Sequence, residues 1–439
     1  MWPSCVRGRM LVVGEERLMT TATRSRAGDI RLGATLFAAR ALIRLSGVLG
    51  DPFADLLRGQ ENPYPVHDRV RAKGPLHRSK LGPYVTASHP LINSILRDKR
   101  FGIRTTDGRL PAAQVDDLPK LDVSFLELDP PDHGRLRKLV APSFTPRRIE
   151  RFRPAIQRAC DGLLDELDHH DTFDLVTQFA TRLPLAVVGE LLGIGEDRWD
   201  DFLRHGAVIG ATLDGVSSVG FAKELKVALR ELHVLFGELV EQRRADPRDD
   251  LTTALVQAQA DDKLTADELL NIFGLLAIAG SETTANLIGN GTLALLRHPE
   301  QWAELRDDPD LAPKVVEETL RYESPVQQSQ RVPHEDVELH GLTVPANSQV
   351  ILLIGAANRD PEVYREPNTF DIHRTDGPDH LSFSSGIHYC IGAPLARLEG
   401  DIAFRSLVTR MPKLTLGGTP KVRRSLVIRG LRSLPLRAS

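Results

Sequence analysis

Cys390 is the residue with the clearest capacity for chemistry, and it lies in the segment FSSGIHYCIGAP that begins at Phe383. An isolated cysteine is more often a small buried hydrophobic residue than a ligand. Here Gly386 and Gly392 flank the cysteine, so the backbone can approach a bulky planar group closely. Pro394 is tolerated only in the first turn of a helix, so a helix begins just after the cysteine. Its free N–H groups and dipole favour a thiolate that donates electron density to a metal, with Phe383 shielding the sulfur from water.

A second candidate is the acid–hydroxyl pair Glu282 and Thr283 in the string AGSETT, inside an apolar pattern that predicts a helix over 266–297. A carboxyl group beside a hydroxyl can pass protons to a reacting group. In the alternative, the helix is ordinary and its threonine hydroxyls bond back to the preceding turn. Gly280 and the β-branched threonines are poor helix formers, so the pattern predicts a local opening of the helix here.

Two weaker patterns place charged side chains at helical spacing. Glu318 and Arg321 are three residues apart, which by itself indicates a surface pair worth ~0.2–0.5 kcal/mol. His133 and Arg137 are four residues apart and share one helix face, which in the alternative is a solvated basic face.

The pattern F-x-x-G-x-H-x-C-x-G resembles the heme-binding loop of the cytochrome P-450 family, and the flanking strings HLSF and APLARLE resemble its soluble bacterial members. Thr283 precedes Glu318 by 35 residues, and Glu318 precedes Cys390 by 72; both separations suit the family. The resemblance runs from about Pro63 to the C-terminus. Ser384 stands where the family often has glycine, a substitution that is conservative in size.

The resemblance implies that the chain binds heme b (iron protoporphyrin IX), with Cys390 as the axial ligand of the iron. It implies that Glu282 and Thr283 are the acid and the alcohol of a proton relay. It also implies that Glu318 and Arg321 are buried and structural, because a buried pair is costly to break. The implied heme contacts are Phe383, Gly386 and Gly392 in the loop, and the propionate donors His133, Arg137, Arg331 and His388, a chemically sensible set for two carboxylates.

The implied reaction inserts one oxygen atom from O2 into a small, apolar organic substrate and releases the other as water. Part of the expected pocket lies one turn before the acid–alcohol pair on the same helix face. The alternative for these residues is simple core packing. The expected lining is Leu275, Ile278, Ala279 and Val326, under a roof formed by segments 101–115 and 205–219.

Electrons are expected from a separate ferredoxin and its reductase, because only 49 residues follow Cys390, too few for a fused flavin domain. Residues 133–158 contain eight Arg or Lys and one acid, and in the family this region borders the face closest to the sulfur. Such a patch suits a small acidic ferredoxin, and a solvated basic face is the alternative. The expected docking residues are Arg135, Lys138, Arg147 and Arg148.

Two rival functions use the same motifs. One is a peroxide-driven oxygenase, against which the acid–alcohol pair argues, because the family's peroxygenases that resemble this chain lack it. The other is a heme-binding sensor or carrier without turnover, which would have no need of a proton relay. Turnover that depends on NAD(P)H and redox proteins separates the three.

The elements that position these residues are mainly helices with a small β portion, the cytochrome P-450 fold. Apolar residues at three- and four-residue spacing predict helices over 149–167, 175–192, 221–244, 266–297, 299–305 and 313–322. Strands are predicted over 83–87, 349–354, 414–416 and 426–428, with a hairpin over 336–345 that turns at His340-Gly341. Residues 61–439 are expected to form one domain behind a basic extension over 1–60, which is frayed or an amphipathic helix.

The composition limits which binding partners and which cellular compartment are expected. A net charge of -3 predicts no general affinity for nucleic acid or for membranes. Three cysteines are too few for a disulfide framework and favour a reducing compartment. No secretory signal or transmembrane span is predicted, so the expected location is the cytoplasm. Met1, Met10 and Met19 are all candidate start residues.

Overall fold

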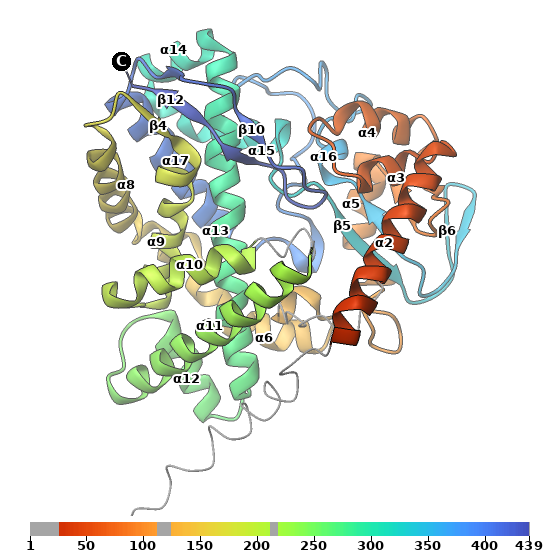
Figure 1. Cartoon of the computed structure of the whole chain (residues 1–439), viewed down its shortest axis with the longest axis horizontal. Coiled ribbons are helices and arrows are strands. Elements are labelled where there is room, and N and C mark those ends of the chain that lie inside the picture. Colours follow the sequence, from red (N-terminus) through yellow and green to blue (C-terminus); the bar gives the residue numbers. More distant parts are fainter. Residues whose placement is uncertain (1–25, 112–123, 211–217, 439) are drawn as a thin grey trace, which may run out of the picture.

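The computed structural model describes residues 26–111, 124–210 and 218–438 of the 439-residue chain. It is mainly α-helical with a small β portion, as predicted (Figure 1). The α-helices of the described residues are α2 (Arg26–Val48), α3 (Pro52–Leu57), α4 (Tyr64–Arg71), α5 (His89–Arg97), α6 (Asp132–Val140), α7 (Pro146–Glu150), α8 (Arg153–Leu167), α9 (Arg182–Leu192), α10 (Trp199–Gly210), α11 (Val219–Ala245), α12 (Leu251–Ala260), α13 (Ala266–Arg297), α14 (Pro299–Asp307), α15 (Ala312–Tyr322), α16 (Ile354–Ala357) and α17 (Ala393–Arg410).

The long helix α13 runs through the middle of the helical body (Figure 1). It begins at a capping box, in which the Thr265 hydroxyl accepts the Glu268 N–H and the Glu268 carboxylate accepts the Thr265 N–H. Its bounds agree with the predicted 266–297. By length and apolarity alone α13 could cross a membrane, but it is mostly buried, as expected of a core helix.

Two predicted helices are interrupted, and proline explains both interruptions. The predicted helix over 149–167 is α7 followed by α8, because Pro154 is tolerated only in a first turn and starts the second helix. The predicted helix over 175–192 begins with a wider π-helical segment, Val176–Ala180, before α9. Pro184 lacks the N–H that a regular helix would donate to the carbonyl of Ala180.

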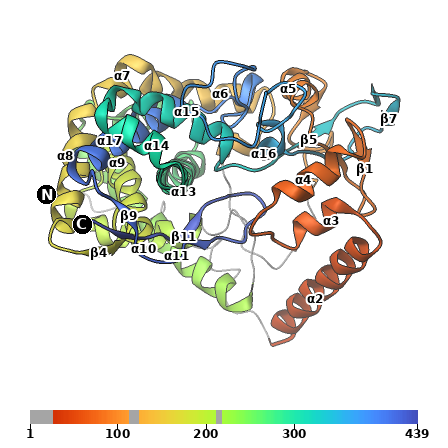
Figure 2. The same cartoon turned by 90° about the horizontal axis from the view of Figure 1, so that it is seen from above.

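The strands are all short, and the largest sheet lies to one side of the helical body, whereas the strands near the C-terminus lie against the body, close to α8 and α13 (Figures 1 and 2). The largest sheet has the order β1-β2-β8-β5-β3. The predicted hairpin is confirmed as β6 and β7, turning at His340 and Gly341 with φ of 48° and 76°, as a tight hairpin requires. The predicted strand over 426–428 is wrong, because only an isolated bridge joins Ile428 to Val326. The strands are β1 (His77–Arg78), β2 (Tyr84–Thr86), β3 (Phe101–Gly102), β4 (Thr172–Asp174), β5 (Ser329–Pro333), β6 (Val337–Leu339), β7 (Leu342–Val344), β8 (Val350–Leu352), β9 (Thr415–Leu416), β10 (Lys421–Val422), β11 (Leu431–Ser433) and β12 (Pro435–Arg437).

The N-terminal helices sit at the outer edge of the β portion (Figure 2). Helix α3 belongs to the body, because Phe53 and Leu56 are buried in a cluster with Val85 of β2. Helix α2 lies along the outside, and its residues from Phe37 onward are mostly exposed.

Candidate active site

The loop that carries Cys390 packs between the end of α5 and the start of α17. The Cys390 N–H donates to the Phe383 carbonyl over 2.8 Å, which closes the loop. Gly386 has a φ of 68°, and a Cβ there would lie 2.2 Å from the Leu96 carbonyl oxygen. Gly386 is therefore required for packing against α5. The approach to a planar group that is expected from the sequence stays a prediction. Gly392 has an ordinary φ of -82°, and a Cβ there would lie 3.9 Å from the Cys390 sulfur.

The start of α17 affects the sulfur in the predicted direction but does not by itself produce a thiolate. Burial raises the pKa of Cys390, and this outweighs the lowering effect of the Gly392 N–H, Arg137, the Ala393 N–H and Arg397. The thiol form is therefore favoured until a cation replaces its proton. A coordinated metal ion does this outright.

Phe383 is buried next to the loop and is held by an ion-pair network that the sequence did not reveal. The Arg397 guanidinium lies 4.6 Å from the Phe383 ring centroid. Arg397 in turn donates to Glu317 over 2.6 and 3.0 Å. The two residues are 80 positions apart, and no local pattern links them.

The four predicted propionate donors come together from α6, β5 and the cysteine loop. The rings of His133 and His388 lie 4.3 Å apart between centroids. Burial, with the nearby Arg331, lowers the pKa of His388 to about 3. Burial also lowers the pKa of Arg331 to about 10, although Asp129 opposes this shift. Arg137 donates to the carbonyl of Tyr389, next to the cysteine, over 2.5 Å.

The protein by itself does not supply acceptors for all the hydrogen-bond donors of this cluster. The Nε2 atoms of His133 and His388 are buried without a hydrogen-bond partner. Asp129 is the only carboxylate among the described residues that affects the pKa of His133 or Arg331. Buried donors without acceptors are costly, and two carboxylates at this place would satisfy them. The donor set therefore fits the propionates of heme.

The predicted opening of α13 at Gly280 is wrong, because the helix is continuous from Ala266 to Arg297. The Thr283 hydroxyl donates to the Ala279 carbonyl over 2.7 Å, and the Ser281 hydroxyl donates to the Ala277 carbonyl over 2.6 Å. The alternative considered from the sequence, hydroxyls that bond back to the preceding turn, is what the structure shows.

Glu282 has a partner that the sequence did not indicate. Its carboxylate forms an ion pair with Arg423, which follows β10, and accepts from the Asn286 amide over 3.3 Å. Both members of the ion pair are largely buried. A separation of 141 residues hides this contact from any local reading of the sequence. Glu282 therefore sits in a defined position beside Thr283.

The expected pocket lining is only partly described. Ala279 is exposed and Thr283 partly exposed on a helix whose neighbouring turns are buried, so this face of α13 borders open space. Leu275 and Ile278 are buried in the main core, whereas Val326 is only partly buried and forms a bridge with Ile428. Parts of the expected roof, residues 112–115 and 211–217, lie outside the described residues. The lining stays a prediction.

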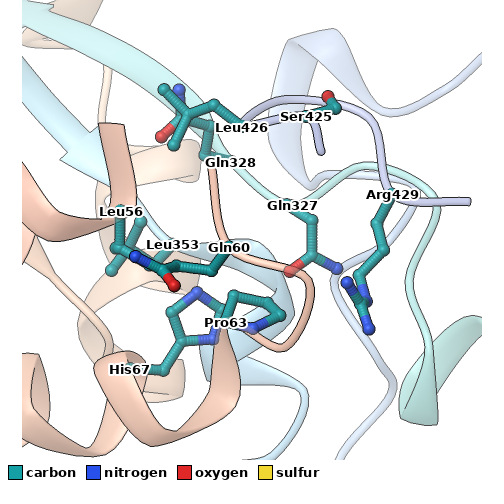
Figure 3. A pocket seen from close by; sticks show the side chains of 10 residues that line it. All are labelled: Leu56, Gln60, Pro63, His67, Gln327, Gln328, Leu353, Ser425, Leu426 and Arg429. Carbon is teal, nitrogen blue, oxygen red and sulfur yellow. The ribbon is translucent and has the colours of Figure 1, made fainter. Parts of the chain in front are cut away.

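A small polar cavity between α4 and the C-terminal loops is too small to be a substrate site (Figure 3). Its volume of about 10 Å³ suits a single water molecule. The side-chain atoms His67 Nδ1 and Gln327 Oε1, on two of its lining residues, have no protein hydrogen-bond partner, and such a water could satisfy them.

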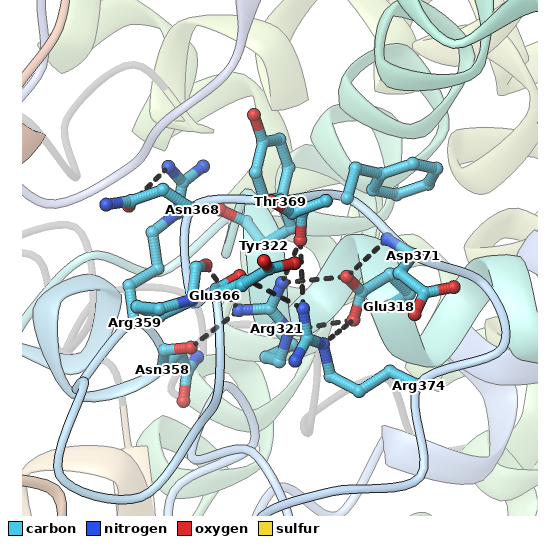
Figure 4. Close-up of polar contacts among 12 residues, drawn as sticks. Glu318, Arg321, Tyr322, Asn358, Arg359, Glu366, Asn368, Thr369, Asp371 and Arg374 are labelled. Carbon is cyan, nitrogen blue, oxygen red and sulfur yellow. Dashed lines mark hydrogen bonds and ion pairs between the residues drawn. The ribbon is translucent and has the colours of Figure 1, made fainter.

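Glu318 and Arg321 form the centre of a buried network (Figure 4). Two parallel hydrogen bonds of 2.7 Å join the guanidinium to the carboxylate. The carboxylate also accepts the Asp371 N–H over 2.8 Å. The remaining guanidinium N–H groups donate to the carbonyls of Asn358, Pro367 and Thr369, at 3.0, 2.8 and 2.9 Å. The pair therefore ties α15 to the segment that leads to the cysteine loop.

By size alone, Ser384 is a conservative replacement for the glycine that the family often has at this position. The structure shows a cost, because the Ser384 backbone is left-handed with a φ of 63° and its buried Oγ has no hydrogen-bond partner. A non-glycine residue in this region costs ~1 kcal/mol. Ser384→Gly is expected to raise the free energy of unfolding by about that amount, measured by urea denaturation. The control is Ser385→Gly, at an extended φ of -149°, which is expected to lower stability. A Ser384→Gly variant no more stable than the parent contradicts the strain.

Comparison with known proteins agrees with this geometry. The family model described as Cytochrome P450 matches residues 218–412. The chain is 39% identical over 407 residues to the cytochrome P450 monooxygenase PikC of Streptomyces venezuelae, covering 89% of this chain and 93% of that protein. It is 44% identical over 314 residues to the 6-deoxyerythronolide B hydroxylase of Saccharopolyspora erythraea, covering 70% and 76% of the two chains.

Solved structures give the same result. The crystal structure of Mycobacterium smegmatis CYP164A2 with econazole bound superimposes with a TM-score of 0.80 at 38% identity, covering 88% of this chain and 99% of that one. The cysteine loop, the incomplete donor cluster and these relatives lead to one conclusion. The chain belongs to the cytochrome P450 family and is a heme-dependent monooxygenase.

Proposed function

We propose that Cys390 is the axial ligand of the heme iron and that Glu282 and Thr283 relay protons while one oxygen atom enters an apolar substrate. The observation that carries the proposal is the buried donor cluster beside the cysteine loop. It offers two imidazole nitrogens and two arginines to a dianionic group, and Arg137 reaches both this cluster and the backbone next to Cys390.

The reaction consumes O2, two electrons and two protons for each substrate hydroxylated, and it releases one water. Heme, when bound, supplies the iron centre that activates O2. The protein residues position the heme, exclude water and deliver the protons. Without proton delivery in the right place, the same two electrons and two protons reduce O2 to hydrogen peroxide.

Proton delivery falls to the two neighbouring groups on α13. The Thr283 hydroxyl donates to the Ala279 carbonyl, which leaves its oxygen lone pairs free to accept a proton from one side while its hydrogen can turn to the other. Glu282 is held as an ion pair by Arg423, so Arg423 acts as a positioning residue for the acid. A water molecule between the two completes the relay.

The expected apolar lining of the pocket and the names of similar proteins support the same class of substrate. Leu275, Ile278, Ala279 and Val326 offer no charge to a ligand. The relatives include proteins named 6-deoxyerythronolide B hydroxylase and Vitamin D(3) 25-hydroxylase. We therefore expect hydroxylation of a mainly apolar organic molecule. A spectral titration with a macrolactone, a secosteroid and a fatty acid, followed by product analysis, identifies the class.

One assay separates the proposal from both rivals. Substrate that gives a spectral shift is incubated with NADPH and a surrogate ferredoxin and reductase. Oxygenated product that requires all of these components supports a monooxygenase. Product formed only with added hydrogen peroxide supports the peroxide-driven alternative, and binding without any product supports a sensor or carrier.

Two of the four residues expected to dock an acidic ferredoxin already have ionic partners within the chain. Arg135 is paired with Glu268 and Asp132, and Arg148 is paired with Asp249. Among the described residues, no ion pair is found for Lys138 or Arg147, both of which are exposed. We propose that these two charges steer the donor.

Reversing both charges, Lys138→Glu with Arg147→Glu, is expected to slow ferredoxin-driven turnover by about tenfold at low salt, because steering raises association rates by ~10–10³-fold. The salt dependence should flatten, since screening acts on the lost charges. The control is Lys421→Glu with Arg432→Glu, the same charge change on the β10–β11 hairpin, far from α6 in both views (Figures 1 and 2). Equal rates and salt slopes for the two double variants would exclude this surface.

A further inference from the structure

Helix α2 lies at the outer edge of the molecule (Figures 1 and 2). One side of it exposes apolar side chains to solvent. Its opposite side packs against α3: Ser46 is buried, and a Cβ on Gly47 would lie 2.6 Å from the Asp55 carboxylate. By contrast, Phe37 is 75% exposed and Val48 is 81% exposed. Besides α3, α2 also contacts α11, but the side that carries Phe37 and Val48 stays exposed.

The exposed residues form a continuous stripe. Phe37, Ala41, Leu45 and Val48 follow one another at spacings of four, four and three residues, which places them on one helix face. Leu42 and Leu49 lie alongside and are also exposed. No other stretch of the described chain exposes as many large hydrophobic side chains. A stripe of this kind marks an interaction surface, because isolated exposed residues are common but contiguous ones are not.

Positive charge borders this stripe. Arg40 and Arg44 follow Phe37 and Ala41 by three residues each, so both lie along the same edge of the apolar face, and both are exposed. The first 50 residues contain eight arginines and three acids in a chain whose net charge is -3. An apolar helix face with a basic edge matches the interface of a membrane that carries anionic headgroups.

A second copy of the chain fits this face less well. Two copies that pack antiparallel along the stripe, related by a two-fold axis, bring their arginine edges onto the same side. Like charges placed together disfavour such an association. An anionic lipid surface instead satisfies the apolar face and the basic edge together.

We propose that α2 is a peripheral membrane anchor, with the stripe from Phe37 to Leu49 lying in the interface of a bilayer that contains anionic lipid and with Arg40 and Arg44 at the headgroups. This proposal rests on α2 and not on the assignment of the catalytic residues. The anchor would hold the enzyme where apolar molecules partition.

The test is co-sedimentation of the full-length, heme-loaded protein with vesicles. One set is phosphatidylcholine alone and the other contains about one third phosphatidylglycerol. Binding is expected to the anionic vesicles and to weaken as salt rises. Arg40→Gln with Arg44→Gln is expected to weaken it by about 30-fold, because each basic residue near such a surface contributes about fivefold.

A second variant tests the apolar face. Phe37→Glu, Leu45→Glu and Val48→Glu together are expected to abolish sedimentation with either vesicle. The matched control carries Val227→Glu, Val234→Glu and Leu416→Glu, which place the same charges on exposed apolar positions elsewhere. The control adds the same negative charge. Any larger loss of vesicle binding in the stripe variant is therefore due to the apolar stripe itself. Heme content should be equal in all variants.

Three outcomes overturn the proposal. The first is no binding to anionic vesicles by the parent protein. The second is a stripe variant that binds as well as the control. The third is a concentration-dependent dimer in size-exclusion chromatography that the stripe variant dissolves while neither protein binds vesicles, which assigns the face to a second copy.

Discussion

Arg321→Ala is expected to yield little or no folded, heme-loaded protein. The change removes both hydrogen bonds to Glu318 and leaves that buried carboxylate with Arg374, 3.5 Å away, as its remaining cationic partner. It also removes a donor from the carbonyls of Asn358, Pro367 and Thr369. Breaking a buried pair costs about 3–5 kcal/mol, against a total stability of about 5–15 kcal/mol.

The measurement is urea denaturation together with heme content after expression. Arg204→Ala is the matched control, because Arg204 pairs with Asp201 at the same three-residue spacing but on an exposed face of α10, at 2.8 Å. Its loss should cost less than about 0.5 kcal/mol. Arg321→Lys should fall between the two, since an ammonium group cannot reach the carboxylate and three carbonyls at once. Equal midpoints for Arg321→Ala and Arg204→Ala would refute the structural role.

Thr283→Ala is expected to uncouple the enzyme. Loss of a positioned proton donor slows proton transfer by ~10²–10⁴-fold, so reducing equivalents pass to hydrogen peroxide instead of product. Heme content and the spectral response to substrate should not change, because within the described part of the chain the hydroxyl bonds only to the Ala279 carbonyl of its own helix. The measurement is product formed, peroxide formed and NADPH consumed in the same reaction.

The control for this variant is Thr292→Ala, further along the same helix. Its hydroxyl makes the equivalent bond to the Ile288 carbonyl, at 2.8 Å, but is fully buried in the core. Removing it tests the loss of a hydroxyl from α13 without touching the relay. A Thr283→Ala enzyme that couples NADPH to product as tightly as Thr292→Ala would remove Thr283 from the mechanism.

Features that depend on neighbouring residues were predictable from the sequence. The apolar period and the Thr265 cap gave α13 its bounds, and the His340-Gly341 pair gave the hairpin its turn. Prediction failed where backbone geometry and tertiary packing determine the local conformation. Size alone did not show that Ser384 must adopt a positive φ. Poor helix propensity at Gly280 did not open α13, because tertiary packing on both sides keeps the helix regular.

The site was predictable in its motifs but not in the partners that hold them. The family resemblance named Cys390, His133 and His388 as site residues, and the structure brings their segments together. Arg423 and Arg397 were not identified, because each reaches its partner across the fold and belongs to no local pattern. Long-range contacts of this kind follow from topology, which one sequence does not specify.

The most direct test of Cys390 as the iron ligand is the absorption spectrum of the reduced protein with carbon monoxide. The parent protein should show the long-wavelength band that is characteristic of the family. Cys160→Ala should keep the band, because burial raises the pKa of that thiol to about 12 and leaves it inert in the core. Cys390→His should lose the band while still binding heme. A Cys390→His protein that retains the band, or a parent protein without it, would contradict the assignment.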